Sequence, residues 1–261
     1  MQNKVIIYIL SCLIFIASAI PADAQLFNKS FWSYGAFGEY IYATHITDFT
    51  ALPGVPNCCP KFTGGNGGGF ALGLLVQYRF YGYNNIYVRL GYQQMNGNLT
   101  VIEPEWVVLN NKLTPAQIQH NINTKFAMPF IEPMYKFNTI IGLSFSIGLN
   151  CAYIVSASYS QNELLIKPEN RGTFENGKRI RNEHSGTLSS TNNFLIFADL
   201  TTEFEFNLDR HKLYVLTPRF AFNYGLNSLF KIEKWRITYF SIGISLKINP
   251  YYDLSNPLEP N

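Results

Sequence analysis

The chain has 261 residues, of which 47% are apolar, 16% aromatic and only 14% charged, with a formal net charge of +3. So few charges exclude an intrinsically disordered chain and are unusual for a water-soluble domain. The basic residues are too evenly spread to form a nucleic-acid-binding surface, so we expect no nucleic-acid partner. The 19 glycines and 13 prolines argue against long helices, and the composition predicts an aromatic-rich, all-β chain.

The N-terminal segment has the pattern of a secretory signal peptide. Lys4 supplies a positive charge, an apolar run follows from Val5 to Ile20, and Ala22-Asp23-Ala24 forms a small-x-small cleavage site. The apolar run is shorter than the roughly 20 residues that a spanning helix needs. We therefore expect residues 1–24 to be removed after Ala24 and the rest to be exported. No later stretch is long enough for a spanning helix, so a mature protein in a membrane would have to be a barrel.

Long segments that alternate between apolar and small or polar residues recur through the rest of the chain. The clearest covers residues 141–157, where odd positions such as Phe145 and Ile147 are apolar and even positions such as Ser144 and Asn150 are small or polar. Its length fits a tilted transmembrane strand. The same pattern predicts eight strands, at residues 31–43, 69–80, 86–102, 121–136, 140–157, 193–206, 212–226 and 234–249.

The connections between these strands alternate in length. The long ones cover residues 44–68, 103–120, 158–192 and 227–233, and the short ones cover 81–85, 137–139 and 207–211. Such asymmetry is typical of an outer-membrane barrel with long extracellular loops and short periplasmic turns. The prediction is a single antiparallel eight-stranded transmembrane β-barrel over residues 25–249, with a short Pro-rich periplasmic tail at 250–261 and both termini periplasmic. A ten-stranded variant, with an extra hairpin in 158–192, is an alternative.

Two local irregularities are expected within this plan. The segment 121–136 changes its apolar phase, which predicts a β-bulge near Pro129–Glu132. The segment 113–119 could form one helical turn, with Thr114 as its N-cap and Pro115 at its first position.

The charged residues of the predicted strands share one face. Because an eight-stranded barrel is only wide enough to be filled by side chains, and because a lipid-facing Arg or Lys is costly, this face is assigned to the lumen. Acids and bases are nearly matched, which predicts a plugged interior held by ion pairs. The predicted network is Glu39, Arg79, Arg89, Asp199, Glu203, Glu205, Arg219 and Lys247. If the turn centres near Asp209, Asp199 lies directly across from Arg219.

Candidates for catalysis or metal binding are sparse. Of the histidines, His45, His120 and His184 fall in predicted outer loops and His211 in a periplasmic turn, and no spacing marks a triad or a metal cluster. We therefore expect no catalytic residue, cofactor or metal. Among the cysteines, Cys151 is expected to face outward.

The adjacent Cys58 and Cys59 lie in the first long loop. Three alternatives stay open: two reduced or loop-buried thiols, which is the preferred one, a vicinal disulfide, or, less favoured, metal binding.

The segments 51–60 (ALPGVPNCCP), 69–75 (GFALGLL) and 172–177 (GTFENG) resemble the bacterial outer-membrane protein β-barrel domain family, the OmpA-like and PorT-type barrels of Gram-negative bacteria. The resemblance covers roughly residues 35–250 and implies an outer-membrane barrel of the cell envelope. In some of these proteins a peptidoglycan-binding domain follows the barrel. The residues after 249 are too few for one, so we expect none here.

The expected function is non-enzymatic: a structural or interaction role in the outer membrane, as a monomer in contact with outer-membrane lipid. Any protein or surface-polysaccharide partner would bind through the loops 44–68 and 158–192, including a partner in a secretion complex. A membrane-embedded lipid-modifying enzyme that uses His184 or His120 is one alternative, and a small-solute pore is another.

Overall fold

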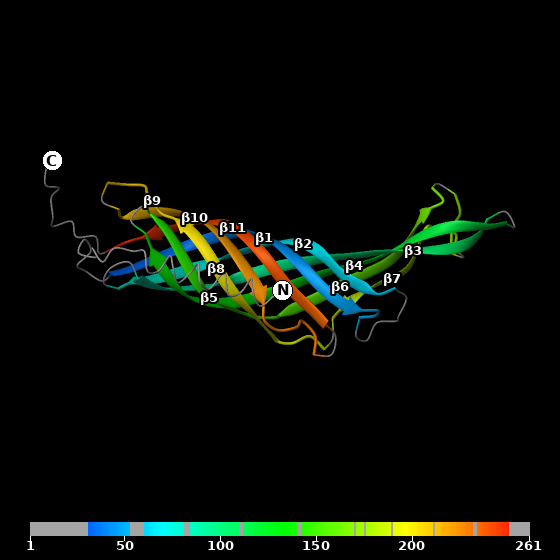
Figure 1. The fold of residues 1–261 in the computed structure, drawn as a ribbon, viewed down its shortest axis with the longest axis horizontal. Coiled ribbons are helices and arrows are strands. Elements are labelled where there is room, and N and C mark those ends of the chain that lie inside the picture. Colours follow the sequence, from blue (N-terminus) through cyan, green and yellow to red (C-terminus); the bar gives the residue numbers. More distant parts are fainter. Residues whose placement is uncertain are drawn as a thin grey trace, which may run out of the picture.

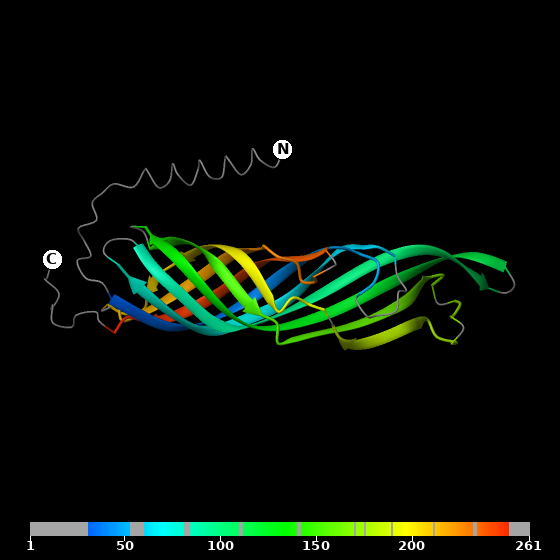
Figure 2. The ribbon, with the colours of Figure 1, turned by 90° about the horizontal axis from the view of Figure 1, so that it is seen from below.

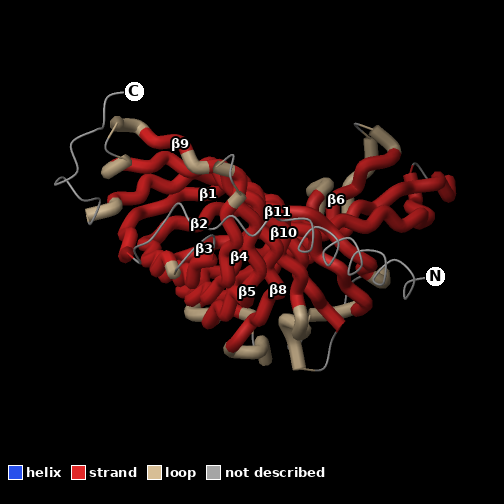
Figure 3. The backbone as a smooth tube through the Cα atoms, turned by 60° about the vertical axis from the view of Figure 1, so that its left-hand side comes forward, coloured by secondary structure: helices blue, strands red, loops and turns tan. Residues whose placement is uncertain are grey.

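The computed structural model describes residues 31–52, 60–80, 84–109, 112–139, 142–169, 171–174, 176–188, 190–210, 212–231 and 234–250. The predicted signal peptide, Cys58, Cys59, His211 and nearly all of the predicted tail lie outside these residues. The regular structure of the described residues is entirely β, in one antiparallel sheet (Figure 3). No helix among them is long and apolar enough to cross a membrane.

Eight strands close into a ring, which confirms the predicted fold. In ring order they are β1 (Phe31–Phe49), β2 (Phe62–Arg79), β3 (Asn84–Leu109), β4 (Lys112–Asn138), β5 (Leu143–Tyr153), β8 (Phe194–Phe204), β10 (Tyr214–Gly225) and β11 (Lys234–Ile248). The ring closes where β11 pairs with β1 (Figure 1). Each strand therefore has two neighbours over its barrel part, and the barrel has no open edge. The short β9 (Phe206–Asn207) pairs with β10.

Four strands also form a sheet outside the ring. Beyond the barrel, β3 and β4 remain paired to their hairpin tip, β6 (Ser156–Lys167) pairs with β4 over Gln117–Ala127, and β7 (Ile180–Thr187) pairs with β6. This part of β3, β4, β6 and β7, called the extension sheet below, projects from one end of the barrel (Figures 1 and 2).

The extension sheet corrects three predictions. Most of the expected loops 103–120 and 158–192 is strand, and the extra hairpin β6–β7 forms outside the ring and adds no barrel strands. The helical turn at 113–119 is also wrong, because Ala116 and Ile118 alternate inward and bury against Leu165, while Pro115 pairs with Trp106. Cross-strand pairing and burial of this inner row override the local Thr-Pro signal.

The predicted bulge in β4 is absent. The β3–β4 register runs without a shift from Asn84↔Phe137 to Leu109↔Lys112. The apolar phase changes because β4 is apolar on both faces: Phe126, Met128 and Phe130 fill the lumen, whereas Ile131 and Tyr135 point outward. The irregularity lies instead on the other side of β4, where its partner strand is interrupted: β5 ends at Tyr153 and β6 begins at Ser156.

The tight connections share one end of the barrel. They join β2 to β3, β4 to β5, and β9 to β10, and that end also holds the start of β1 and the end of β11. The other end holds the end of β1, the start of β2 and the ends of β10 and β8 that face away from the short turns, and the extension sheet continues from it. The predicted asymmetry of short and long connections therefore holds, although the strands run farther into the long side than expected.

Candidate functional site

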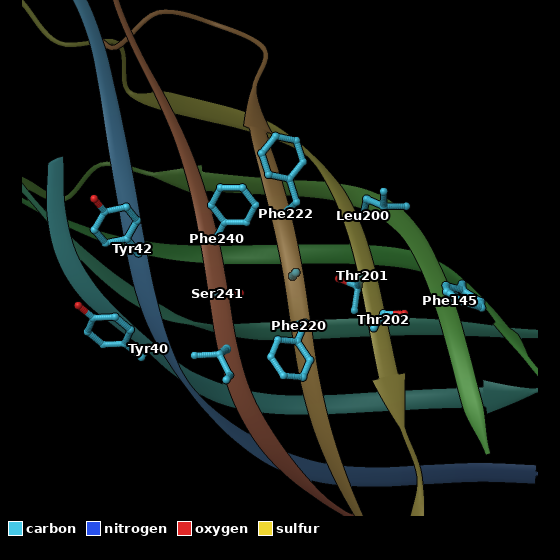
Figure 4. Close-up of a pocket in the computed structure, with 12 residues that line it drawn as sticks. Tyr40, Tyr42, Phe145, Leu200, Thr201, Thr202, Phe220, Phe222, Phe240 and Ser241 are labelled. Atoms are coloured by element: carbon cyan, nitrogen blue, oxygen red, sulfur yellow. The ribbon is translucent and has the colours of Figure 1, made fainter. Parts of the chain in front are cut away.

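The outward surface of the barrel is a continuous apolar belt. Along β8, for example, Phe194, Ile196, Leu200 and Phe204 are exposed, and the residues between them are buried or half-buried. Cys151 is a free thiol on the outward row of β5. Figure 4 shows a shallow groove on this surface, walled by the outward rings of Tyr40, Tyr42, Phe220, Phe222 and Phe240.

Aromatic side chains pair at both ends of this belt. At the short-turn end, the ring centroids of Trp32 and Tyr78 lie 4.6 Å apart. Toward the long-loop end, those of Tyr153 and Phe194 lie 5.1 Å apart. Amphipathic rings in two bands are typical of the two interfaces of a membrane-spanning barrel.

The lumen holds a balanced network of ten charged side chains. The structure places all eight of the predicted network residues there and adds Glu132 and Lys136 from β4, which sequence reasoning missed. The bases are Arg79, Arg89, Lys136, Arg219 and Lys247, and the acids are Glu39, Glu132, Asp199, Glu203 and Glu205. Its five bases and five acids allow every charge to be paired.

Two guanidinium groups organise the half of the network that lies farther from the short turns. Arg89 Nη1 donates to Glu132 Oε2 at 2.5 Å, and Arg89 Nη2 donates to Glu39 Oε1. Arg219 donates to Glu39 Oε1 at 2.8 Å and to Glu132 Oε1 at 3.2 Å, so both arginines share the same two carboxylates. Arg89 also lies 3.8 Å from the ring centroid of Phe37. Charge-assisted bonds from one guanidinium to two carboxylates fix the side-chain geometry.

The other half of the network centres on Glu205. Lys136 Nζ donates to Glu203 Oε2 at 2.6 Å and to Glu205 Oε1 at 2.8 Å, and Lys247 Nζ donates to the same Glu205 oxygen at 2.5 Å. Arg79 Nη2 donates to Glu205 Oε2 at 3.5 Å. Lys136 is fully buried, so its two carboxylates offset the cost of removing its charge from water.

The predicted pairing of Asp199 with Arg219 is wrong in register. Arg219 pairs across the strands with Glu203, and Asp199 pairs with Asn223. The Asp209 carboxylate accepts hydrogen bonds from the backbone N–H groups of Leu213 and Tyr214. The pairs Arg219↔Glu203 and Leu216↔Phe206 place the middle of the connection later in the chain than assumed. Arg219 Nη2 nonetheless reaches Asp199 Oδ2 at 3.2 Å, because its side chain runs along the lumen.

An aromatic cluster fills the lumen at the long-loop end. Trp235 is fully buried and stacks on Phe49, with ring centroids 5.2 Å apart. Its Nε1–H donates to His45 Nδ1 at 2.9 Å, so His45 Nε2 carries the proton that is donated to the Asn96 carbonyl at 3.0 Å. His45, expected in a loop, is thus a neutral core residue. The glycine at Gly97 makes room for it, since a Cβ there would lie 2.8 Å from the imidazole.

The extension sheet has its own ionic cluster on its inner face. Glu163 Oε2 accepts from Arg181 Nε at 2.5 Å, and its Oε1 accepts from Asn182 Nδ2 at 2.7 Å. Burial raises the pKa of Glu163. These two bonds and the Arg181 charge lower the pKa by more than burial raises it, so the net pKa is below the ordinary value. His120 is buried between Glu163, 3.7 Å away, and Glu103, 3.5 Å away. His184 pairs across the strands with Gln161.

No group of three or more metal-binding side chains occurs within the described ranges.

Comparisons with known proteins find similar structures and no sequence relatives. No family model matches the chain and no curated protein matches it, so the OmpA-like and PorT-type assignment stays a prediction. Neisserial surface protein A is 9% identical over 83% of this chain and 96% of that chain, with a TM-score of 0.37. Ail, the attachment invasion locus protein of Yersinia pestis, solved with the heparin analogue sucrose octasulfate, is 11% identical over 84% and 99%, with a TM-score of 0.33.

A Pseudomonas aeruginosa FadL homologue is 7% identical over 88% of this chain and 92% of that chain, with a TM-score of 0.25. All three are outer-membrane β-barrel proteins. Identities and TM-scores this low give no basis for a functional inference.

Proposed function

We propose that this chain is a bacterial outer-membrane protein with a non-conducting barrel, and that it acts as a non-enzymatic interaction protein by presenting the extension sheet outside the membrane. The short turns would then face the periplasm. The observation that carries the membrane assignment is the belt: large apolar side chains such as Leu74 and Ile147 are more than 60% exposed on a closed barrel. A soluble protein rarely exposes so continuous an apolar surface to water, whereas a membrane-spanning barrel has such a surface in contact with lipid.

The filled lumen supports a barrel that does not conduct. Arg89, Glu132 and Lys136 are each at most 1% exposed, and the Trp235 cluster fills the lumen at the other end. A water-filled pore would hydrate these charges and would not need their mutual pairing. We therefore place the function outside the lumen, on the extension sheet.

The test is reconstitution of the full mature protein. Migration in a gel should shift on boiling, and protease added to intact cells should cut the chain only on the side opposite the short turns, in the extension sheet or in the long connections. In planar bilayers the folded protein should give no stable openings. Stable, ion-selective conductance would overturn the plugged barrel in favour of the pore.

The enzyme alternative has a separate readout. The lipid A of cells that express the protein should be unchanged in mass. A mass change that is lost in His120→Ala or His184→Ala would overturn the non-enzymatic proposal.

A further inference from the structure

The outward surface changes character abruptly on one side of the barrel. On β2, β3 and β4 the apolar belt ends near Phe70, Tyr92 and Ala127. The next outward positions are Gln94 on β3 and Lys125 on β4, and β2 continues through Gly68 to Asn66. The surface called the amide face below consists of Thr44, Asn66, Asn96, Asn98, Thr100, Asn121, Asn123, Lys125, Ser158, Ser160 and Asn162. Lys125 is its one ionic side chain.

The strand register aligns these side chains in rows. One row runs directly across five strands as Thr44↔Asn66↔Asn98↔Asn123↔Ser160. The row nearer the belt is Asn96↔Lys125↔Ser158, and the row farther away is Thr100↔Asn121↔Asn162. Directly opposed side chains lie about 5 Å apart, so each row is a continuous strip of polar groups.

The rows differ in whether their hydrogen bonds are already used. In the far row, Thr100 Oγ1 donates to Asn121 Oδ1 at 3.2 Å and Asn121 Nδ2 donates to Asn162 Oδ1 at 3.0 Å. In the central row, the side chains of Asn98 and Asn123 have no hydrogen-bond partner in the described part of the chain. These two amides therefore direct free donors and acceptors outward.

A groove of about 370 Å³ lies over these free groups. Its lining includes Asn98, Asn123, Lys125 and Ser160, and Gly68 leaves one wall without a side chain. The adjacent Gly67 is required for another reason: a Cβ there would lie 1.8 Å from the Asn96 carbonyl oxygen, so β2 can approach β3 only through glycine.

We propose that the amide face binds the saccharide headgroup of a glycolipid in the outer leaflet of the same membrane. Sugar hydroxyls both donate and accept, which matches carboxamides and serine hydroxyls, and a phosphate on the sugar would pair with Lys125. The groove has no carboxylate in its lining, so nothing there repels such a phosphate.

The choice of a lipid-anchored sugar rests on the proposed function, because it requires the belt to lie in the membrane. The polar rows follow the belt directly on the same outward face of β2, β3 and β4, at the height where headgroups begin. A headgroup held at Asn98 and Asn123 would leave its acyl chains against Phe70 and Ala127. A free polysaccharide would gain nothing from this continuity.

The experiment measures binding of fluorescent short-core lipopolysaccharide to the folded, full-length mature protein in detergent. The test variant is Asn98→Ala/Asn123→Ala, and Gln117→Ala is the matched control, since Gln117 is outward on β4 but beyond the amide face. We expect the double variant to bind about tenfold more weakly, because it loses hydrogen bonds worth about 1.4 kcal/mol in total. The control should bind like the wild type.

Three outcomes would overturn the inference while leaving the barrel intact. The first is that the double variant binds lipopolysaccharide as tightly as the wild type does. The other two are that the wild type binds the soluble core oligosaccharide, or phosphatidylethanolamine, as tightly as it binds lipopolysaccharide. Both variants must still show the heat-dependent gel shift, as expected for exposed positions. If instead the wild-type protein shows no shift and is recovered in the soluble periplasmic fraction, the proposed function falls together with this inference.

Discussion

The barrel and the extension sheet are built from the same strands, yet different interactions hold them together. Inside the ring, every strand has two neighbours and ten charges pair in the lumen. In the extension sheet, β7 has only β6 as a neighbour and all but one of its residues are exposed. The barrel should therefore unfold as one cooperative unit, and β7 should open locally at a much lower free energy.

Removing a lumen guanidinium should have the largest effect. Arg219→Met leaves Glu39, Glu132 and Asp199 with one cation fewer, and we expect it to lower the free energy of unfolding by about 3–5 kcal/mol. Unfolding in urea, followed by the heat-dependent gel shift, measures this. Arg236→Met is the matched control: its guanidinium is outside and bonds only to the Tyr224 hydroxyl, so it should cost under about 1 kcal/mol. Equal losses would contradict a lumen network that stabilises the barrel.

A methyl group added inside the ring should cost less but still be measurable. A Cβ at Gly243 would lie 2.3 Å from Glu39 Cγ, so Gly243→Ala should cost about 1–3 kcal/mol in the same unfolding assay. Gly38, which pairs with Ile244 one position away, has nothing within 4 Å of its Cβ position. Gly38→Ala should therefore be nearly neutral. A neutral Gly243→Ala would mean that the lumen can repack around Glu39.

Removing part of the extension sheet should leave the barrel folded. Replacing residues 158–187 with a short Gly-Ser linker deletes most of β6 and all of β7 but retains every ring strand. The heat-dependent gel shift should persist with little change in its midpoint. Loss of the folded band would show that the two regions form one cooperative unit.

The smallest expected effect is a pH dependence confined to β7. The folded-state pKa of Glu163 is lowered, so its bonds to Arg181 and Asn182 stabilise the hairpin above about pH 4.5, and this stabilisation is lost as the pH falls through the lowered value. Hydrogen exchange of β7 amides, corrected for intrinsic rates, should therefore accelerate on acidification. In Glu163→Gln the exchange should already be faster near neutral pH and should respond less to acid.

The barrel was predictable because period-two alternation reports directly on a wall with an exposed apolar surface on one side and a packed lumen on the other. The same rule failed for β4, where Phe126 and Met128 are apolar yet face inward, so the facing of Glu132 and Lys136 was not assigned. The Asp199–Arg219 register was wrong because the turn does not centre near Asp209: the pairs Arg219↔Glu203 and Leu216↔Phe206 place its middle later in the chain. Alternation indicates which face a residue occupies, but it does not fix where a turn centres.

The extension sheet was missed for a different reason. The outward rows nearest the barrel are rich in asparagine, serine and threonine, whose composition is that of a loop. Only the inner row of Ala116, Ile118 and Leu165 carried a strand signal, and it is short. The sequence of a polar strand and that of a polar loop cannot be told apart until the strand's pairing partners, which lie far away in the sequence, are known.

The unbroken pairing of β3 with β4 has a mechanical consequence. The two strands are 26 and 27 residues long and share one continuous register. At about 3.3 Å per residue they span roughly 85 Å along the strand, against a hydrocarbon core of about 30 Å. Because no bulge interrupts this ladder, it works as a stiff stalk whose root is fixed in the barrel wall. In the proposed membrane setting, whatever the tip contacts is held at a set distance and angle from the bilayer, and a pull on the tip would be transmitted to the lumen through Phe126 and Glu132.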